Sequence, residues 1–289
     1  MPIKLGAFFP TRDMPADGNK IRDWVQAAEE LGFDYVEVSD HVLGADRVAL
    51  PEFHGPYDVD DSFHETFCTL SFMAAVTKRV GLASGVLILP QRQTALVAKQ
   101  AAQIDVLSGG RLRLGVGIGW NPVEYAALDQ DWNTRGRRQT EQIQLMHELW
   151  TRRTVYFKGK YDTVRHAGIN PLPIQRPIPI WFGGGADATL RRAAKLGKGW
   201  IPLGHPGSKT EKMVDDLYQY LAESSRDPAD FGIEAWIRYG EGNPDEWAKT
   251  AESWIKIGAT HLTFYTSGQG VGPLNEQIAA MREFKNTLS

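Results

Sequence analysis

One stretch of the sequence, residues 80–120, limits the possible folds more than any other. Two apolar runs, Val80–Leu89 and Leu112–Ile118, flank a segment with helical periodicity, Thr94–Leu107. Neither run alternates between apolar and polar residues, which is typical of parallel strands covered on both faces. The second run contains closely spaced glycines and leads to Trp120. Glycines at a strand end allow a ligand to approach the backbone closely, so this stretch predicts a βαβ unit beside a ligand site.

The same succession of apolar run and helical segment recurs along the whole chain. Strands are expected near residues 3, 35, 80, 112, 178, 199, 232 and 260, and a helical segment follows each of them. Eight such repeats in 289 residues predict a TIM barrel that forms one domain over residues 1–289. An open, doubly wound sheet is the alternative. The glycines at 115, 117 and 119 lack the G-x-G-x-x-G spacing that a dinucleotide-binding sheet of that kind carries.

Two segments interrupt this succession. Residues 154–177 contain a short predicted hairpin and then three prolines, which predicts an insertion before the fifth strand. Residues 42–62 are rich in Pro, Gly, Asp and His and show no periodicity, so we expect a long loop after the second strand. Loops of this length in compact domains are usually functional or mobile.

Composition argues against several classes of protein. The chain has 32 basic and 35 acidic residues, a net charge of −3, without the concentrated positive charge that favours nucleic acids or membrane surfaces. No apolar run reaches the roughly 18 residues of a membrane span. The first residues do not resemble a signal peptide, so we expect a cytoplasmic protein. The single cysteine, Cys68, fits a reducing compartment, and its apolar neighbours predict a buried structural thiol.

The sequence also lacks the common motifs for metal or serine catalysis. The histidines are scattered, with no H-E-x-x-H pattern, so no metal site is predicted. No G-x-S-x-G nucleophile motif is present. A glycine-rich site without these groups suggests that a bound organic cofactor performs the chemistry on a small-molecule substrate.

The adjacent residues Asp40 and His41 are the clearest polar candidates, because they directly follow the expected second strand. An imidazole at a strand end can exchange a proton with a reacting group near neutral pH. The alternative is a histidine that only holds the long loop. Gly183, Gly184 and Gly185 precede a predicted helix, where free backbone N–H groups form either a phosphate site or a flexible turn.

Two further groups of residues have a structural and a functional interpretation. Ser84, Gly85 and Val86 interrupt an apolar run, which predicts either a bulge beneath a flat ligand or a close-packed barrel layer. Arg135, Arg137 and Arg138 begin a helix, where cations oppose the helix dipole. One of them pairs with an anion such as a cofactor phosphate, or all three form a solvated charge run.

Several motifs, in order along most of the chain, resemble the bacterial luciferase-like superfamily of flavin-dependent oxidoreductases. The Leu-Ser-Gly-Gly-Arg segment that leads into a glycine-rich strand is the most specific of them. The matching segments are Val38-Ser39-Asp40-His41, Val97–Gln100, Asp105–Arg111, Leu114–Trp120, Pro179–Gly184 and Gly199-Trp200.

The resemblance implies a TIM barrel that binds FMN or the deazaflavin coenzyme F420 at the carboxyl ends of its strands, and homodimers are common in the superfamily. A bulge after the third strand, often with a non-prolyl cis peptide, would support the cofactor ring. An Asp-His pair is similar to the F420-dependent branch, in which the aspartate lies near the cofactor and the histidine near the transferred hydride. The cofactor-binding residues implied here are Asp40, Ser84, Gly85, Val86, Gly117, Gly119, Trp120, Gly183, Gly184 and Gly185.

One position departs from the superfamily pattern. F420-dependent sugar-phosphate dehydrogenases have a glutamate where this chain has Trp120. Trp120, Phe8, Phe9 and Phe53 therefore favour an apolar substrate, with His41 as the proton donor or acceptor during hydride transfer. The alternatives are an FMN-dependent monooxygenase that uses reduced flavin and O2, and a cofactor-binding protein without turnover. In the last case, we expect the loop at 42–62 to block the substrate side of the ring.

Overall fold

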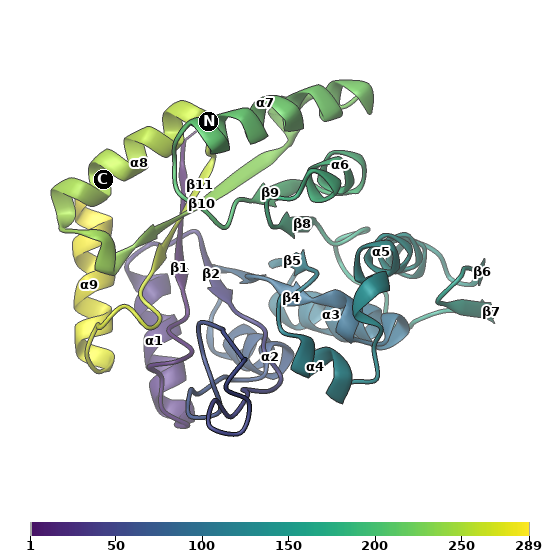
Figure 1. Cartoon of the computed structure of the whole chain (residues 1–289), viewed down its shortest axis with the longest axis horizontal. Coiled ribbons are helices and arrows are strands. Elements are labelled where there is room, and N and C mark those ends of the chain that lie inside the picture. Colours follow the sequence, from purple (N-terminus) through teal and green to yellow (C-terminus); the bar gives the residue numbers. More distant parts are fainter. Residues whose placement is uncertain (1, 289) are drawn as a thin grey trace.

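Eight parallel strands close into a barrel in the computed structural model, which describes residues 2–288 (Figure 1). The sheet closes because β3 pairs with both β2 and β5. The third barrel strand is interrupted after β3 and continues as the short β4, which pairs with β5. The barrel strands are β1 (Lys4–Phe8), β2 (Tyr35–Val38), β3 (Gly81–Ser84) with β4 (Leu87–Ile88), β5 (Leu112–Gly117), β8 (Ile180–Gly183), β9 (Gly199–Ile201), β10 (Gly232–Arg238) and β11 (His261–Tyr265).

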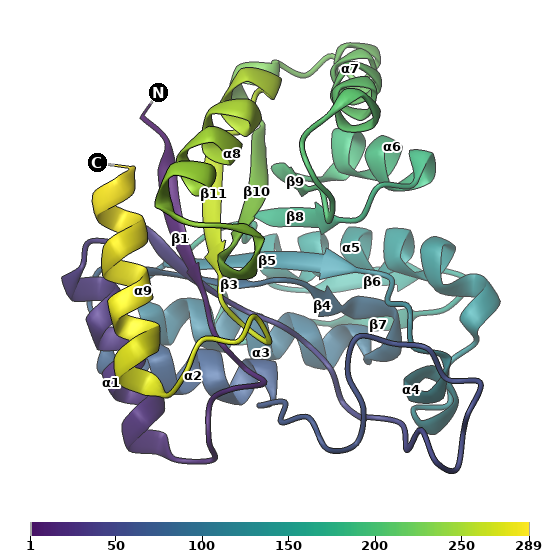
Figure 2. The same ribbon diagram turned by 60° about the vertical axis from the view of Figure 1, so that its left-hand side comes forward.

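Helices surround this barrel, and the apolar core lies between them and the strands (Figures 1 and 2). The predicted TIM barrel is thus confirmed, and the open sheet is excluded. The helices are α1 (Gly18–Glu30), α2 (Thr66–Val76), α3 (Thr94–Ser108), α4 (Pro122–Ala127), α5 (Arg135–Thr151), α6 (Asp187–Leu196), α7 (Ser208–Glu223), α8 (Pro244–Ile257) and α9 (Leu274–Thr287).

Local sequence explains where individual helices begin and end. Asn243 accepts hydrogen bonds at the start of α8, Glu246 completes a capping box, and Pro244 occupies the first turn. Gly258 ends the same helix in the left-handed conformation that glycine adopts without strain. These signals set the two ends of α8 between strands β10 and β11. None of the helices within residues 2–288 is long and apolar enough to cross a membrane.

The predicted insertion is present as a two-stranded antiparallel hairpin before β8. It consists of β6 (Val155–Lys158) and β7 (Thr163–Ala167), and it pairs with no barrel strand. The long loop at 42–62 is also present, and Tyr57 from this loop is almost fully buried. The loop therefore reaches the carboxyl ends of the barrel strands, where its residues Pro56 and Tyr57 line a cavity.

The expectation of a buried Cys68 was wrong, because the thiol is exposed on α2. Phe67, Leu70 and Met73 are the residues of this helix that face the core. Cys68 and Phe72 lie on the opposite side, since a helical period of 3.6 turns them away from the barrel. Apolar neighbours in the sequence do not predict burial in a helix that is apolar on every face.

The interior of the barrel contains a buried charged cluster below the carboxyl ends of the strands. Arg113 lies 2.5 Å from Glu234 and 3.9 Å from Glu37, and both glutamates are fully buried. The guanidinium also stacks over the rings of Tyr35 and Trp181. Burial, and then the nearby Glu234 carboxylate, raise the pKa of Glu37 well above its usual value.

Candidate active site

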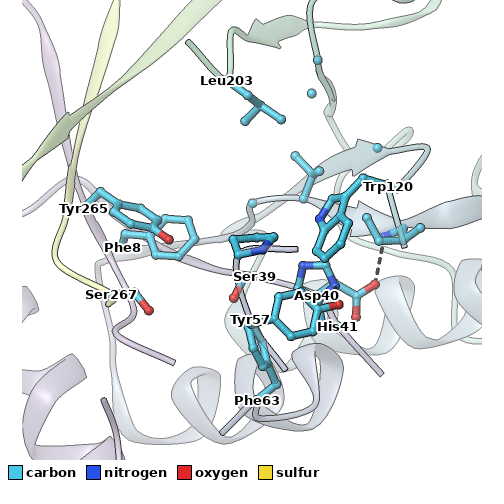
Figure 3. A pocket seen from close by; sticks show the side chains of 18 of the residues that line it. Phe8, Ser39, Asp40, His41, Tyr57, Phe63, Trp120, Leu203, Tyr265 and Ser267 are labelled. Carbon is cyan, nitrogen blue, oxygen red and sulfur yellow. Dashed lines mark hydrogen bonds between the residues drawn. The ribbon is translucent and has the colours of Figure 1, made fainter. Parts of the chain in front are cut away.

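A cavity of about 350 Å³ lies at the carboxyl ends of the barrel strands. Its walls come from residues that end or follow several strands and from Pro56 and Tyr57 of the long loop. Figure 3 shows Phe8 and Tyr265 on one side of the cavity, Trp120 and His41 on the other, and Leu203 above them. TIM-barrel enzymes carry their active sites at this end of the barrel.

The interrupted third strand forms the floor of the cavity. The peptide bond between Gly85 and Val86 is cis, as the resemblance implied for this segment. A side chain at residue 85 would collide with the Glu37 carboxylate below it. A Cβ atom at Gly117 or Gly183 would lie 2.6 or 2.8 Å from a methyl group of Val86. These glycines therefore leave the space in which Val86 sits at the floor.

An aromatic wall faces this floor from the strands at the other side of the barrel. The rings of Trp236 and Tyr265 stack with centroids 5.1 Å apart, and Phe8 lies 4.5 Å from Tyr265. The indole Nε1 of Trp236 donates a hydrogen bond of 3.1 Å to Glu37. The buried glutamate thus fixes one ring of the wall from below.

Asp40 is buried, and its carboxylate is already fully hydrogen-bonded. Arg92 donates to both oxygens, at 2.6 and 3.3 Å. The Thr66 hydroxyl lies 3.0 Å from Oδ1 and 2.8 Å from the Ser39 carbonyl, and the backbone N–H of Ile88 donates to Oδ2 at 2.8 Å. Because Ile88 follows the floor segment, Asp40 ties the end of β2 to the floor of the cavity.

His41 lines the cavity, and its Nδ1 edge is turned toward two other polar groups. Nδ1 lies 2.6 Å from the hydroxyl of Tyr57 and 3.4 Å from Oε1 of Glu124. The imidazole also contacts the rings of Tyr57, Phe63 and Trp120, with centroid distances of 4.2, 5.0 and 5.8 Å. Nε2 has no hydrogen-bond partner among residues 2–288, so this edge is left for a ligand.

Glu124 is fully buried and connects α4 with the long loop. Its Oε1 accepts the backbone N–H groups of Val42 at 2.7 Å and Leu43 at 3.2 Å, and Gln91 donates to Oε2 at 3.1 Å. Burial opposes ionisation of this carboxyl, but the hydrogen bond and charge of His41 outweigh it, so the pKa of Glu124 is lowered. Glu124 is therefore a carboxylate directly behind His41.

Trp120 forms the outer part of the wall beside His41. Its ring lies 5.2 Å from Tyr57 and 5.8 Å from Phe53, and the side chain remains 36% exposed. A side chain at Gly55 would collide with the indole, so glycine at this loop position allows the loop to pack on Trp120. Where the sugar-phosphate branch of the resembled superfamily has a carboxylate, this site has an apolar surface.

A second cavity of about 590 Å³ begins at Gly185 and extends to the start of α7. Leu203 lines both cavities. The N-cap residues of α6 and α7 are Ala186 and Gly207, and neither provides a side-chain hydrogen bond to the helix. The first N–H groups of these helices therefore lack a side-chain acceptor, which is the arrangement that binds phosphate groups.

Comparison with known proteins identifies the family of this chain. The family model described as luciferase-like monooxygenase matches residues 3–285. This chain belongs to the luciferase-like monooxygenase family. It is accordingly an oxidoreductase, as the resemblance implied.

The relatives of this chain include proteins that are named for different cofactors. An uncharacterised protein of Mycobacterium tuberculosis is 34% identical over 70% of this chain and 71% of its own. An F420-dependent glucose-6-phosphate dehydrogenase of Gordonia bronchialis is 31% identical over 89% and 75% of the two chains. An FMNH(2)-dependent dimethylsulfone monooxygenase of Pseudomonas putida is 28% identical over 75% and 57%.

A solved structure shares the fold over the full length of both chains. It is an F420-dependent secondary alcohol dehydrogenase in complex with an F420–acetone adduct. The two chains superpose with a TM-score of 0.82 at 18% sequence identity, and the match covers 100% of each. At this identity the likeness shows the luciferase-like barrel and no more.

Most of the residues predicted for the site line the two cavities of this luciferase-like barrel. Ser84 is an exception, because it is buried and its hydroxyl donates to the carbonyl of Gly115 at 2.8 Å. Phe9 is also buried, against Trp24 and His64. The predicted residues that line the first cavity are Phe8, Asp40, His41, Gly85, Val86, Gly117, Gly119, Trp120, Gly183 and Gly184, and Gly185 lines the second.

The arginines at the start of α5 do not line either cavity. Arg135 stacks on Trp132 with its guanidinium 3.7 Å from the ring centre, and Arg138 donates to the carbonyl of Arg92 at 3.3 Å. Arg137 is exposed. Within the described residues, no group of three His, Cys, Asp or Glu side chains is placed to hold a metal ion.

Sequence reasoning missed Tyr57 and Glu124. Tyr57 lies in a loop without periodicity, and Glu124 lies in the six-residue helix α4, which was not predicted. The segment Asn121-Pro122-Val123-Glu124 did contain a signal for this helix. Asn121 caps it, and Pro122 occupies its first turn, the preferred position for proline.

Proposed function

We propose that this luciferase-like oxidoreductase transfers a hydride between coenzyme F420 and an uncharged, largely apolar organic substrate. The observation that carries the proposal is the position of His41, which lines an apolar cavity beside the floor at Gly85 and Val86 and whose Nε2 has no hydrogen-bond partner among residues 2–288. His41 is the proton donor or acceptor in this reaction. Asp40 acts by holding the floor and Arg92 in place.

The charges around the cavity support an uncharged substrate. Arg12 is the permanent cation among the described residues that line it, and Asp61 already binds this guanidinium at 2.7 Å. Arg92 is bound by Asp40. A phosphorylated substrate would therefore find no free cation here, and the apolar ring of Trp120 replaces the acidic group of the sugar-phosphate branch.

The two cavities fit a cofactor that has a flat ring and an anionic tail. Gly85, Val86, Gly117, Gly119 and Gly183 would hold the ring against the floor, and F420 would supply a ring carbon that accepts or gives a hydride. Gly184 and Gly185 lie between the ring cavity and the uncapped starts of α6 and α7. The start of α7 lines the second cavity, and a helix N-terminus suits a negatively charged tail. The choice of F420 over FMN rests on the Asp40-His41 pair, which resembles the F420-dependent branch.

Titration of the purified protein with F420 and separately with FMN, followed by fluorescence, tests this choice. We expect saturable binding of F420 and much weaker binding of FMN. Tight FMN binding with negligible F420 binding would overturn the proposal in favour of a reduced-flavin monooxygenase. If neither cofactor binds, both the F420-dependent function and the reduced-flavin function would be excluded.

The loop at 42–62 does not fill the space beside the floor, because its residues Pro56 and Tyr57 border an open cavity of about 350 Å³. This observation favours an enzyme over a cofactor-binding protein without turnover. A screen of uncharged alcohols and ketones with F420, followed by the change in cofactor absorbance, tests for turnover.

A further inference from the structure

The side chains behind His41 form a network whose hydrogen positions are fixed by counting donors and acceptors. Asn121 accepts the backbone N–H of Val123 at 3.0 Å through Oδ1, so its Nδ2 is the donor toward the Tyr57 hydroxyl at 3.1 Å. Burial raises the pKa of Tyr57 well above its usual value, so the phenol keeps its proton. Tyr57 therefore has one hydrogen to donate, either to Glu124 at 3.3 Å or to His41 at 2.6 Å.

Only one of these two arrangements satisfies every group. If Tyr57 donates to His41, Nδ1 carries a lone pair and no proton. This lone pair then faces the negatively charged Glu124 carboxylate, whose Oε1 lies 3.4 Å from Nδ1. If Tyr57 donates to Glu124, Nδ1–H of His41 donates to the phenol oxygen, which accepts Asn121 as well. A hydroxyl oxygen has two acceptor positions, so the second arrangement uses all of them.

We infer that Glu124 and Tyr57 are positioning residues that keep a proton on Nδ1 of His41 and leave the Nε2 lone pair directed at the substrate. A buried carboxylate that holds an imidazole in this way also stabilises the imidazolium that forms when Nε2 takes a proton. The inference rests on the proposed function for its role in turnover, but the position of the proton is a property of the protein without cofactor.

The arrangement favours a substrate with a hydroxyl group on the carbon that gives the hydride. In the oxidative direction, the C–H bond would break with its electron pair, and bound F420 would supply the acceptor for this hydride. The O–H bond breaks as well, its proton goes to Nε2, and the carbon–oxygen bond becomes a carbonyl. In the reverse direction, Nε2 would return the proton to the carbonyl oxygen, and reduced F420 would supply the hydride.

The network also links the site to the long loop. Glu124 Oε1 accepts the N–H groups of Val42 and Leu43, Asn121 Nδ2 donates to the Leu43 carbonyl at 3.3 Å, and Tyr57 comes from the same loop. Tyr57 therefore reaches Nδ1 of His41 only while the loop is packed on α4.

Nitrogen-15 NMR of histidine-labelled protein without cofactor, at a pH where His41 is neutral, tests the proton position. The Ala variant of His41 assigns the signal. We expect a pyrrole-type shift for Nδ1 and a pyridine-type shift for Nε2. The opposite pattern in the folded protein would overturn the inference and leave the proposed cofactor untouched. If F420 fails to bind, the proposed cofactor would be overturned, and the inference about the proton on His41 would stand.

Two variants and a matched control test the roles of the partners. Glu124→Gln and Tyr57→Phe should each shift His41 toward the Nε2–H tautomer and lower kcat about 10²-fold, the low end of what a general base contributes, without weakening F420 binding. Tyr125→Phe removes another buried phenol on α4, whose hydroxyl donates to the Ile118 carbonyl, and should leave the His41 tautomer unchanged. Because Glu124→Gln also disturbs the loop, Tyr57→Phe is the decisive variant. An unchanged tautomer in folded Tyr57→Phe would contradict the role of Tyr57.

Discussion

At the scale of single residues, the site separates groups that react from groups that hold the others in place. His41 has one free edge at the cavity, whereas the Asp40 carboxylate has no free oxygen left for a ligand. The pair is adjacent in sequence and sits at one strand end, yet its members are expected to behave differently on mutation. Loss of His41 should lower turnover, and loss of Asp40 should disturb the floor of the cavity at Gly85 and Val86.

Replacement of His41 by alanine should leave F420 binding intact and lower turnover by about 10²–10⁴-fold, the usual contribution of a general acid or base. Fluorescence titration measures the first quantity and steady-state kinetics the second. His54→Ala is the control, since His54 is an exposed histidine of the same loop that does not line the cavity. Unchanged turnover in His41→Ala would remove this residue from the mechanism.

Gly184→Ala should weaken cofactor binding. Gly184 has a φ of +112° and lines the ring cavity, and a Cβ atom added to it would have no other atom within 4 Å. Gly109 is a matched control, with a φ of +72° and equally open surroundings at the end of α3. Both alanine variants should lose about 1 kcal/mol of stability through backbone strain. Equal F420 affinity in the two variants would contradict the assignment of Gly184 to the cofactor.

At the scale of elements, the sequence predicted what depends on local pattern. Apolar runs predicted every barrel strand, because burial on both faces leaves a clear signature. The hairpin was predicted from its turn residues. The contacts between His41, Tyr57 and Glu124 depend on how the long loop packs on α4, which no local pattern encodes. The exposure of the Cys68 thiol was not predicted for the same reason. Neighbouring elements determine which face of a helix without charged residues is buried.

The buried cluster inside the barrel should make stability depend on pH. The pKa of Glu37 is raised above its usual value of 4.5, so the folded protein holds this proton more tightly than the unfolded chain does. The contribution of this group to the free energy of unfolding is therefore complete below about pH 4.5. It decreases as the pH rises from there toward the pKa of the folded state. Glutamine at this position mimics the protonated acid, and Glu37→Gln should flatten this part of the pH dependence.

Urea unfolding of wild type and Glu37→Gln at several pH values from 5 to 9 measures the effect. The variant should keep the hydrogen bond from Trp236 to the side-chain oxygen and fold normally. Parallel curves for wild type and Glu37→Gln would show that Glu37 is already ionised in the folded protein.

At the scale of the whole molecule, one face of the barrel exposes several large apolar side chains on neighbouring helices. The eleven residues of α2 include no charged side chain, and Phe72 is 39% exposed on it. Helix α3 lies beside α2 (Figure 2). It exposes Leu96 and Leu107, at 51% and 53%. A helix that is apolar on every face is usually buried, so a partner surface is expected here.

We therefore expect a homodimer in which α2 and α3 of one protomer pack against the same helices of its partner, since a two-fold axis brings identical surfaces together. Light scattering after size-exclusion chromatography should give twice the chain mass of 32.2 kDa. Phe72→Glu and Leu96→Glu should each place a charge in the apolar contact and yield a monomer. Val48→Glu, at a loop position that is 93% exposed, should remain dimeric. A monomeric wild type at micromolar concentration would contradict the predicted assembly, and dimeric glutamate variants would place the contact elsewhere on the barrel.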